Sequence, residues 1–275
     1  MTKVKGKVVA ITGAGSGIGR ALALSLVQKG ATVAISDVDE AGLSETASLL
    51  TGKGRVSTHV LDVRDREAWA AYAAAVEGEH GGADVIINNA GVAVRASIED
   101  ISYEDFEFVM NVNFWGVVYG TKTFLPLFRR RGAGHVVNIS SINGLVPFAL
   151  QSPYNASKYG VLGFNETLMQ ELAGSPIRVT SVHPGGIRTN IAKSGRHVTA
   201  EQAAFFDTIA RTSADEAALQ IVQGIECDRQ RVYVGADAKV MQTAKRLLPA
   251  FTVNLFGKVS LGWAEKALKP AGRTS

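Results

Sequence analysis

The chain has 275 residues, of which 46% are hydrophobic, and its formal net charge at pH 7 is +4. A chain of this length can bury a large core, and a small charge without a basic stripe argues against nucleic acid as a partner. The single cysteine, Cys227, excludes an internal disulfide and a multi-cysteine metal site.

The first residues contain no apolar core typical of a signal peptide, and no run of about 18 apolar residues could span a bilayer. A chain without disulfides fits a reducing compartment. We therefore expect a cytoplasmic protein. Cys227 lies in an apolar helical pattern, so we expect its side chain to be buried.

Short β-branched runs alternate with longer helical patterns along the chain. The runs are apolar throughout, as in a parallel sheet covered on both faces, and the alternation is typical of a doubly wound fold. In chain order, the predicted strands are residues 7–12, 31–37, 55–63, 83–91, 134–141, 177–185 and 230–235. The predicted helices are residues 20–29, 40–51, 66–80, 103–130, 153–173 and 214–229.

These elements predict an α/β fold: a Rossmann-like, doubly wound, seven-stranded parallel sheet with helices on both faces. Residues 1–237 are expected to form this single domain, and residues 238–275 a C-terminal helical extension. Ligands of such sheets bind beyond the carboxyl ends of the strands. Polar residues gather at six of these ends, namely Thr12, Asp37, Asp62, Asn88 with Asn89, Ser140 with Ser141, and His183.

The first strand is followed by the loop TGAGSGIG, residues 12–19. The fingerprint G-x-G-x-x-G does not fit this loop, since its third glycine falls on Ile18 or Arg20. Glycines at this position still let the backbone approach a pyrophosphate, which the N-terminus of the following helix attracts. Alone, the loop is equally compatible with a simple turn.

Asp37 ends the second strand, 18 residues beyond Gly19. A carboxylate there can accept hydrogen bonds from the adenosine ribose and repels the 2′-phosphate of NADP, for which neither Ser16 nor Ser36 supplies a cation. The sequence therefore favours NAD over NADP. Alternatively, Asp37 is a helix cap, because Glu40 follows three residues later as in a capping box.

The segment YNASK places Tyr154 and Lys158 four residues apart in a predicted helix, on one face. A free tyrosine has a pKa near 10, and a nearby ammonium group lowers that pKa by favouring the phenolate. Tyr154 is thus a candidate general acid/base. The same pair also occurs in ordinary helices.

Six motifs occur in one order on this chain: TGAGSGIG, NNAG (88–91), NVNFWG (111–116), NISS (138–141), YNASK (154–158) and HPG (183–185). Together they resemble the short-chain dehydrogenase/reductase superfamily, in its compact single-domain branch, over about residues 5–234. The loop pattern of that family, T-G-x-x-x-G-x-G, matches Thr12, Gly13, Gly17 and Gly19. The branch that contains sugar epimerases spaces its glycines differently.

The resemblance implies that Tyr154 is the catalytic acid/base and that Lys158 lowers its pKa and holds the nicotinamide ribose. Ser141, thirteen residues before Tyr154, matches the serine that hydrogen-bonds the substrate oxygen. Its neighbour Ser140 is the rival candidate, but points to the opposite face of the strand. Asn113 matches the asparagine that helps to position Lys158 through a water-linked proton relay.

The resemblance also implies a row of cofactor contacts along the sheet edge. Besides Tyr154 and Lys158 they are Gly13, Ser16, Gly17, Ile18, Gly19, Asp37, Asp62, Val63, Asn89, Ala90, Gly91, Pro184, Gly185, Ile187 and Thr189. The expected substrate contacts are Ser141, Asn143, Phe148, Gln151, Tyr154 and Gly186, with Val92, Val94, Val146 and the loop from residue 186 to about residue 206 completing the wall. No His, Cys or carboxylate cluster suggests a metal.

The expected activity is that of an NAD-dependent oxidoreductase on a secondary alcohol or ketone. The mostly apolar substrate wall favours a lipophilic molecule, such as an alicyclic, aromatic or steroid-like alcohol. A small hydroxyketone of the acetoin type is the alternative, and sugars come next. A non-catalytic NAD-binding regulator is the alternative from another class of function.

Residues 239–269 extend past the usual end of the family and interleave apolar with basic residues. We expect helices that cover the pocket or form a subunit interface, with contact to a membrane surface as the alternative. Pro249 should break the segment into two pieces. Family members are usually dimers or tetramers, so a homo-oligomer is expected.

Overall fold

The structure is a computed structural model of the chain. It describes residues 2–52, 54–189, 191, 195–199, 204, 208 and 210–268. Parts of two predicted segments lie outside these residues: positions within the substrate loop that was expected to reach about residue 206, and the end of the C-terminal extension after residue 268.

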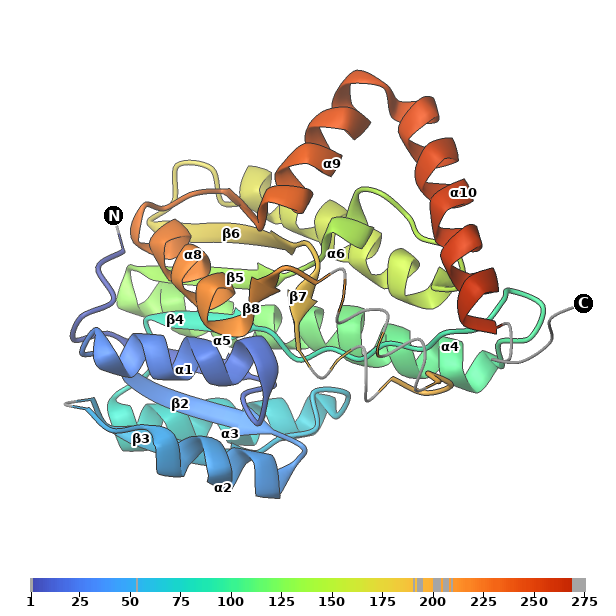
Figure 1. Ribbon diagram of the computed structural model, residues 1–275. Helices are drawn as coiled ribbons and strands as arrows, with labels where there is room; N and C mark the ends of the chain where they lie inside the picture. The colour runs from blue at the N-terminus through green and yellow to red at the C-terminus, as the bar shows by residue number, and fades with distance from the viewer. Residues whose placement is uncertain are drawn as a thin grey trace, which may run out of the picture.

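Seven parallel strands form one sheet in the order β3-β2-β1-β4-β5-β6-β9 (Figure 1), which confirms the predicted seven-stranded Rossmann-like sheet. Each of the seven strands begins and ends within a few residues of the range predicted for it. The direction in which successive strands are added to the sheet reverses between β1 and β4, so a ligand is expected to bind in the crevice beyond the carboxyl ends of these two strands. The strands are β1 (Val8–Thr12), β2 (Thr32–Asp37), β3 (Val56–Val60), β4 (Val85–Asn88), β5 (Gly134–Ile139), β6 (Ile177–Pro184) and β9 (Arg231–Val234).

Helices cover both faces of the sheet because successive strand residues point to opposite sides. Val9 and Ile11 of β1 face a core layer shared with α1 and α8, whereas Ala10 between them faces a layer shared with α3, α5 and α6. The helices of the domain are α1 (Gly17–Gln28), α2 (Glu40–Leu49), α3 (Arg66–His80), α4 (Tyr103–Met110), α5 (Gly116–Arg131), α6 (Ser152–Glu171) and α8 (Ala214–Glu226).

The helix predicted over residues 103–130 is interrupted. A π-helical turn, η1 (Asn111–Trp115), separates α4 from α5. A π turn inserts one residue into the helical repeat and is often found at functional sites. A short pair of strands that was not predicted, β7 (Ile187–Arg188) and β8 (Thr212–Ser213), joins the segment after β6 to the start of α8.

The C-terminal extension forms two helices, α9 (Ala236–Leu247) and α10 (Pro249–Leu268), and the break falls at Pro249 as predicted. Figure 1 shows them as an inverted V that rises from the end of the sheet and returns toward the side of α4 and α6. Cys227, predicted to be buried, is exposed, because it lies just past the end of α8 rather than on its inner face. Within the described part of the chain, every helix is too short or too polar to cross a membrane.

Candidate active site

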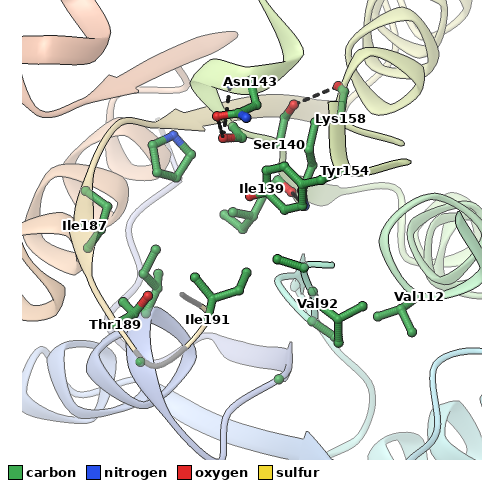
Figure 2. Close-up of a pocket in the computed structure, with 18 of the residues that line it drawn as sticks. Val92, Val112, Ile139, Ser140, Asn143, Tyr154, Lys158, Ile187, Thr189 and Ile191 are labelled. Carbon is green, nitrogen blue, oxygen red and sulfur yellow. Dashed lines mark hydrogen bonds between the residues drawn. The ribbon is translucent and has the colours of Figure 1, made fainter. Parts of the chain in front are cut away.

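A cavity of about 530 Å³ opens at the carboxyl ends of the strands. Its walls are mostly apolar and come from the β1–α1 loop, the ends of β2, β4 and β5, the start of α6, the segment after β6, and α9–α10. Figure 2 shows Tyr154 and Lys158 side by side on one wall, with Val92, Ile187 and Thr189 around the opening.

The β1–α1 loop is held close to the strand that follows it across the switch point. Gly13 has a φ of +66°, and a Cβ there would lie 2.7 Å from the Cα of Ala90. The Asn89 side chain donates to the carbonyls of Thr12 at 2.9 Å and Gly13 at 3.0 Å, and the Thr12 hydroxyl accepts from the Asn89 and Ala90 amides. These bonds tie residues 12–13 after β1 to residues 89–91 after β4, so the two segments form one continuous wall of the cavity.

The first turn of α1 leaves its amides available to a ligand. Asp39, Asp65 and Ser102 cap α2, α3 and α4 with their side chains, whereas Ser16 at the start of α1 makes no such capping bond to its helix. Unpaired amides and the positive end of a helix dipole attract phosphate groups. The geometry therefore fits the pyrophosphate of a dinucleotide.

Asp37 lies at the end of β2 and lines the cavity. Its carboxylate accepts from the Gly15 amide at 2.7 Å and from the Asp39 amide at 3.0 Å. The alternative interpretation of Asp37 as the cap of α2 is wrong, because Asp39 caps that helix.

Asp62 follows β3 and also lines the cavity. Arg64 binds it through both carboxylate oxygens, at 2.6 Å and 3.0 Å. This pairing lowers the pKa of the Asp62 carboxyl, which keeps it an acceptor. The sequence alone did not indicate that Arg64 belongs to this cavity, which it also lines.

Ser140 and Ser141, at the end of β5, have different partners. The Ser140 hydroxyl is buried and donates to the Lys158 carbonyl at 2.9 Å, so it ties β5 to α6. The Ser141 hydroxyl accepts from the Asn143 backbone amide at 3.1 Å and is close enough to the Tyr154 phenol to lower its pKa. The structure therefore favours Ser141 over Ser140 as the serine that faces a substrate.

Tyr154 and Lys158 occupy successive turns of α6, with the Lys158 ammonium 5.6 Å from the centre of the Tyr154 ring. Burial lowers the pKa of Lys158 to about 8, and its ammonium donates to the Ile139 carbonyl at 3.0 Å. Burial raises the pKa of the Tyr154 phenol, which hydrogen bonding to Ser141 lowers only in part. Burial is thus the largest influence on the pKa of the phenol, and the lowering by Lys158 that the resemblance implies stays a prediction.

Asn113 lies in the π turn behind the cavity wall and is fully buried. Its side chain accepts from the Val92 amide at 2.8 Å and donates to the Val92 carbonyl at 2.9 Å and to the Ser157 hydroxyl at 3.2 Å. These bonds hold the segment after β4 against α6, next to Lys158. Asn113 is not among the residues that line the cavity, and the water-linked proton relay expected through it stays a prediction.

A buried chain of hydrogen bonds runs across the sheet toward Ser141. It passes from Asn88 to Asn138 at 2.7 Å, to Asn165 at 2.6 Å, to Ser181 at 2.8 Å and to His183 at 3.0 Å. The His183 ring then donates from Nδ1 to the Ser141 carbonyl at 3.3 Å, the tautomer being fixed by this direction. Burial lowers the pKa of His183 to about 4, so it stays neutral and supports Ser141 structurally.

The substrate side of the cavity contains all six predicted substrate contacts. The side-chain amide of Asn143 donates to the side-chain oxygens of Gln151 at 3.2 Å and Asn155 at 2.9 Å, which fixes this wall in front of Tyr154. The C-terminal helices close the same side. Phe256 packs on Phe148 with ring centres 6.1 Å apart, and the Ser260 hydroxyl accepts from the Ala149 amide at 3.1 Å.

The structure gathers the predicted cofactor residues around this cavity, except Gly19, which lies in α1 against the carbonyl of Gly13. The prediction is wrong for two wall residues, since Val94 and Val146 lie in the buried interior and do not line the cavity. Asp237, which lines the cavity and accepts from the Gly186 amide at 2.6 Å, was not predicted. Other wall residues that the sequence did not indicate are Arg95, Phe108, Val112, Met241 and Ser260.

Among the described residues, no three His, Cys, Asp or Glu side chains are grouped so that they could hold a metal ion. The fold and the site are those of a Rossmann-like oxidoreductase that binds a dinucleotide beside a tyrosine–lysine pair. A family model described as short chain dehydrogenase matches residues 7–199. The chain belongs to this family of oxidoreductases, which use a nicotinamide cofactor.

Individual relatives agree with this assignment. SadH of Mycobacterium tuberculosis, named as an oxidoreductase, is 45% identical over 256 residues, covering 90% of this chain and 93% of its own. A trans-4-hydroxycyclohexanecarboxylate dehydrogenase of Sinomonas cyclohexanicum is 40% identical over 194 residues, 68% of this chain and 74% of its own. A short-chain dehydrogenase/reductase from Burkholderia phymatum, crystallised with NAD, superposes with a TM-score of 0.80 at 29% identity, covering 90% of this chain and 96% of that one.

Proposed function

We propose that this protein is an NAD-dependent dehydrogenase that interconverts a secondary alcohol and its ketone. The observation that supports the proposal best is the convergence of Ser141, Tyr154 and Lys158 on one wall of a cavity whose far end bears Asp37. A non-catalytic NAD-binding regulator would have no need for all three side chains at the substrate end.

The residues divide the chemistry among them. When bound, the nicotinamide accepts a hydride from the alcohol or supplies one to the ketone. Tyr154, half-buried in the cavity wall, can as a phenol donate its proton to a ketone oxygen or, as a phenolate, remove the proton of an alcohol. Ser141 hydrogen-bonds the same oxygen, where charge develops, and Lys158 favours the phenolate electrostatically.

NAD is proposed as the preferred cofactor because, among the residues that the structure describes, no free cation lies at the end of β2 to meet a 2′-phosphate. Asp37 would repel that group, and the next residue, Val38, is apolar and exposed. The nearby Arg20 is already engaged by the Gly15 carbonyl at 2.5 Å and by Glu45 at 2.7 Å. Arg64 is engaged by Asp62.

The apolar wall supports a lipophilic substrate with an alicyclic or aromatic body. The relative from Sinomonas cyclohexanicum is named for a cyclic secondary alcohol, which supports the alicyclic class. Van der Waals contact with Val92, Val112, Phe148 and Met241 would reward an apolar ring more than a polyhydroxylated sugar. A small hydroxyketone would leave most of these side chains without a partner.

A panel of secondary alcohols, scored by NADH absorbance with NAD and with NADP, tests the proposal. Cyclohexanols and aryl alcohols should be oxidised with NAD at a higher kcat/KM than acetoin or sugars. NADH binding without turnover of any alcohol, or of any ketone in the reverse direction, would favour the regulatory alternative instead.

We also propose that the protein is a homo-oligomer, with the turn between α9 and α10 as a contact surface. This turn projects from the body of the protein, and its apolar side chains are exposed, with Leu247 at 71%, Leu248 at 57% and Phe251 at 60%. Sedimentation velocity should give a dimer or tetramer that Phe251→Glu dissociates. A monomer that instead binds anionic lipid vesicles would indicate a membrane contact.

A further inference from the structure

Arg95 lies on the segment that leaves β4, and its backbone is fixed on both sides. Its amide donates to the Arg196 carbonyl at 3.3 Å, and the amide of Ala96 donates to the Leu150 carbonyl at 3.2 Å. Val94 and Ala96 also form isolated parallel bridges with Arg196 and Gln151. The position of Arg95 is therefore set by the backbone and not by any pairing of its side chain.

This segment places Arg95 in the substrate half of the cavity. Leu150 and Gln151, which lie beside it, line the cavity just before Tyr154. Arg95 itself lines the cavity, together with Val92 and Ala93 of its own segment. The adenosine half is marked by Asp37 and Asp62, which follow β2 and β3 on the other side of the switch point.

The Arg95 side chain is partly buried and forms no hydrogen bond or ion pair with any residue that the structure describes. Burial alone lowers the pKa of its guanidinium, with no carboxylate to oppose the effect. Arginine nevertheless keeps its proton in proteins, so the charge persists and remains poorly solvated. A ligand that brings a negative group would relieve this cost.

The other lysine and arginine side chains that the structure describes along the cavity wall, and Arg196 beside it, have partners. Arg64 is paired with Asp62. Lys158 is bound to the Ile139 carbonyl. Arg196 donates to Asp105 at 2.8 Å and stacks over the Phe108 ring at 4.1 Å, while His197 takes the other Asp105 oxygen at 2.8 Å. Arg95 is thus the cavity-lining cation that the described residues leave available for a substrate.

We propose that Arg95 binds a carboxylate of the substrate, and that the substrates are hydroxy acids or oxo acids with an apolar body between the carboxylate and the reacting carbon. The proposal rests on the proposed function and specifies the substrate of that same site. A guanidinium binds a carboxylate through two parallel hydrogen bonds, which fixes the orientation of the bound molecule. One cation among apolar neighbours suits a single negative charge better than a phosphate dianion, which needs several donors.

Matched substrates test the proposal. Hydroxycyclohexanecarboxylates with the hydroxyl at position 3 or 4 are compared with their methyl esters, which keep the ring and the alcohol but lack the charge. The wild-type enzyme should prefer the best acid over its ester. Arg95→Met should lower kcat/KM for that acid roughly 10- to 100-fold, mainly through KM, and should change the value for the ester less than about threefold.

Two further variants separate charge from packing. Arg95→Lys keeps a cation without the bidentate geometry, so it should retain part of the preference for the acid. Arg129→Met removes an exposed arginine from the end of α5, outside the cavity, and should leave the preference unchanged.

A binding measurement makes the result independent of turnover. The same acids are titrated into the NADH complex, and binding is followed by NADH fluorescence, for wild type and Arg95→Met. Equal affinity for acid and ester in the wild type, or equal effects of Arg95→Met on both, would overturn the proposal. If neutral cyclohexanols are still oxidised in that case, the proposed function stands; if no alcohol is oxidised, the proposed function fails while the fluorescence titration still decides the role of Arg95.

Discussion

At the residue scale, identical side chains close together in the chain have different tasks, and this provides matched controls. Tyr154 and Tyr159 both lie on α6, but Tyr154 lines the cavity while the Tyr159 hydroxyl bonds the Leu145 carbonyl. Tyr154→Phe should lower kcat roughly 10²- to 10⁴-fold, because it removes the proton donor. NADH affinity, measured by fluorescence, should stay within a few-fold.

The control Tyr159→Phe should keep nearly full activity. Comparable losses in the two variants would mean that α6 has merely been disturbed, and an active Tyr154→Phe enzyme would contradict the assignment of Tyr154 as the acid/base.

Asp37 provides a second residue-scale test. Asp37→Asn keeps an acceptor for the Gly15 amide but removes the negative charge. NADP should then gain on NAD, with the ratio of their kcat/KM values shifting roughly tenfold or more, because repulsion of the 2′-phosphate is removed. Asp39→Asn keeps a good cap for α2 and should leave the ratio unchanged. An unaltered ratio in Asp37→Asn would place the specificity elsewhere.

At the element scale, α10 covers the substrate end of the cavity through a few side chains. Phe256→Ala removes the ring that packs on Phe148 and should raise KM for bulky alcohols several-fold, while KM for NAD changes little. Leu255→Ala, on the outer side of the same helix, should leave both unchanged. If steady-state kinetics show equal effects on alcohol and NAD, α10 supports the whole domain rather than the substrate wall.

Much of the fold could be predicted because its signals are local. Strands such as β1 and β4 are short apolar runs, and the polar residues that follow them are conspicuous. The π turn at Asn113 could not be seen, since one extra residue leaves the apolar pattern of a helix nearly intact. Cys227 was misjudged because a helix prediction extended slightly too far moved it from an exposed end to an inner face.

The residues of the candidate site also fall into those that could be predicted from local sequence and those that could not. Ser141, Tyr154 and Asp37 lie at strand ends or in a compact motif, so their convergence follows from the topology of the sheet. Arg95, Asp237 and Met241 could not be placed, because their positions depend on loop pairing and on the packing of α9, which join residues far apart in the sequence.

At the scale of the whole molecule, two buried histidines of the sheet should make the free energy of unfolding depend on pH. His183 belongs to the hydrogen-bond chain that ends at Ser141, and His135 bridges Thr180 at 2.8 Å and Thr2 at 3.1 Å. Burial lowers the pKa of each to about 4. Because an unfolded histidine has a pKa near 6.5, the unfolded chain binds protons between pH 6.5 and 4 that the native protein does not.

The free energy of unfolding should therefore be highest above pH 6.5 and fall as the pH is lowered through this window. From pH 7.5 to pH 5, each histidine should contribute a loss on the order of 2 kcal/mol. His59, whose pKa burial also lowers, acts in the same direction. Urea unfolding followed by circular dichroism at pH 7.5, 6 and 5 measures the decline, and most carboxyl groups remain ionised over this range. His135→Gln and His183→Gln should each flatten the curve even if they lower its plateau, since they remove a titrating group; a wild-type stability that is constant from pH 7.5 to 5 would show that these rings are charged or solvated in the native protein.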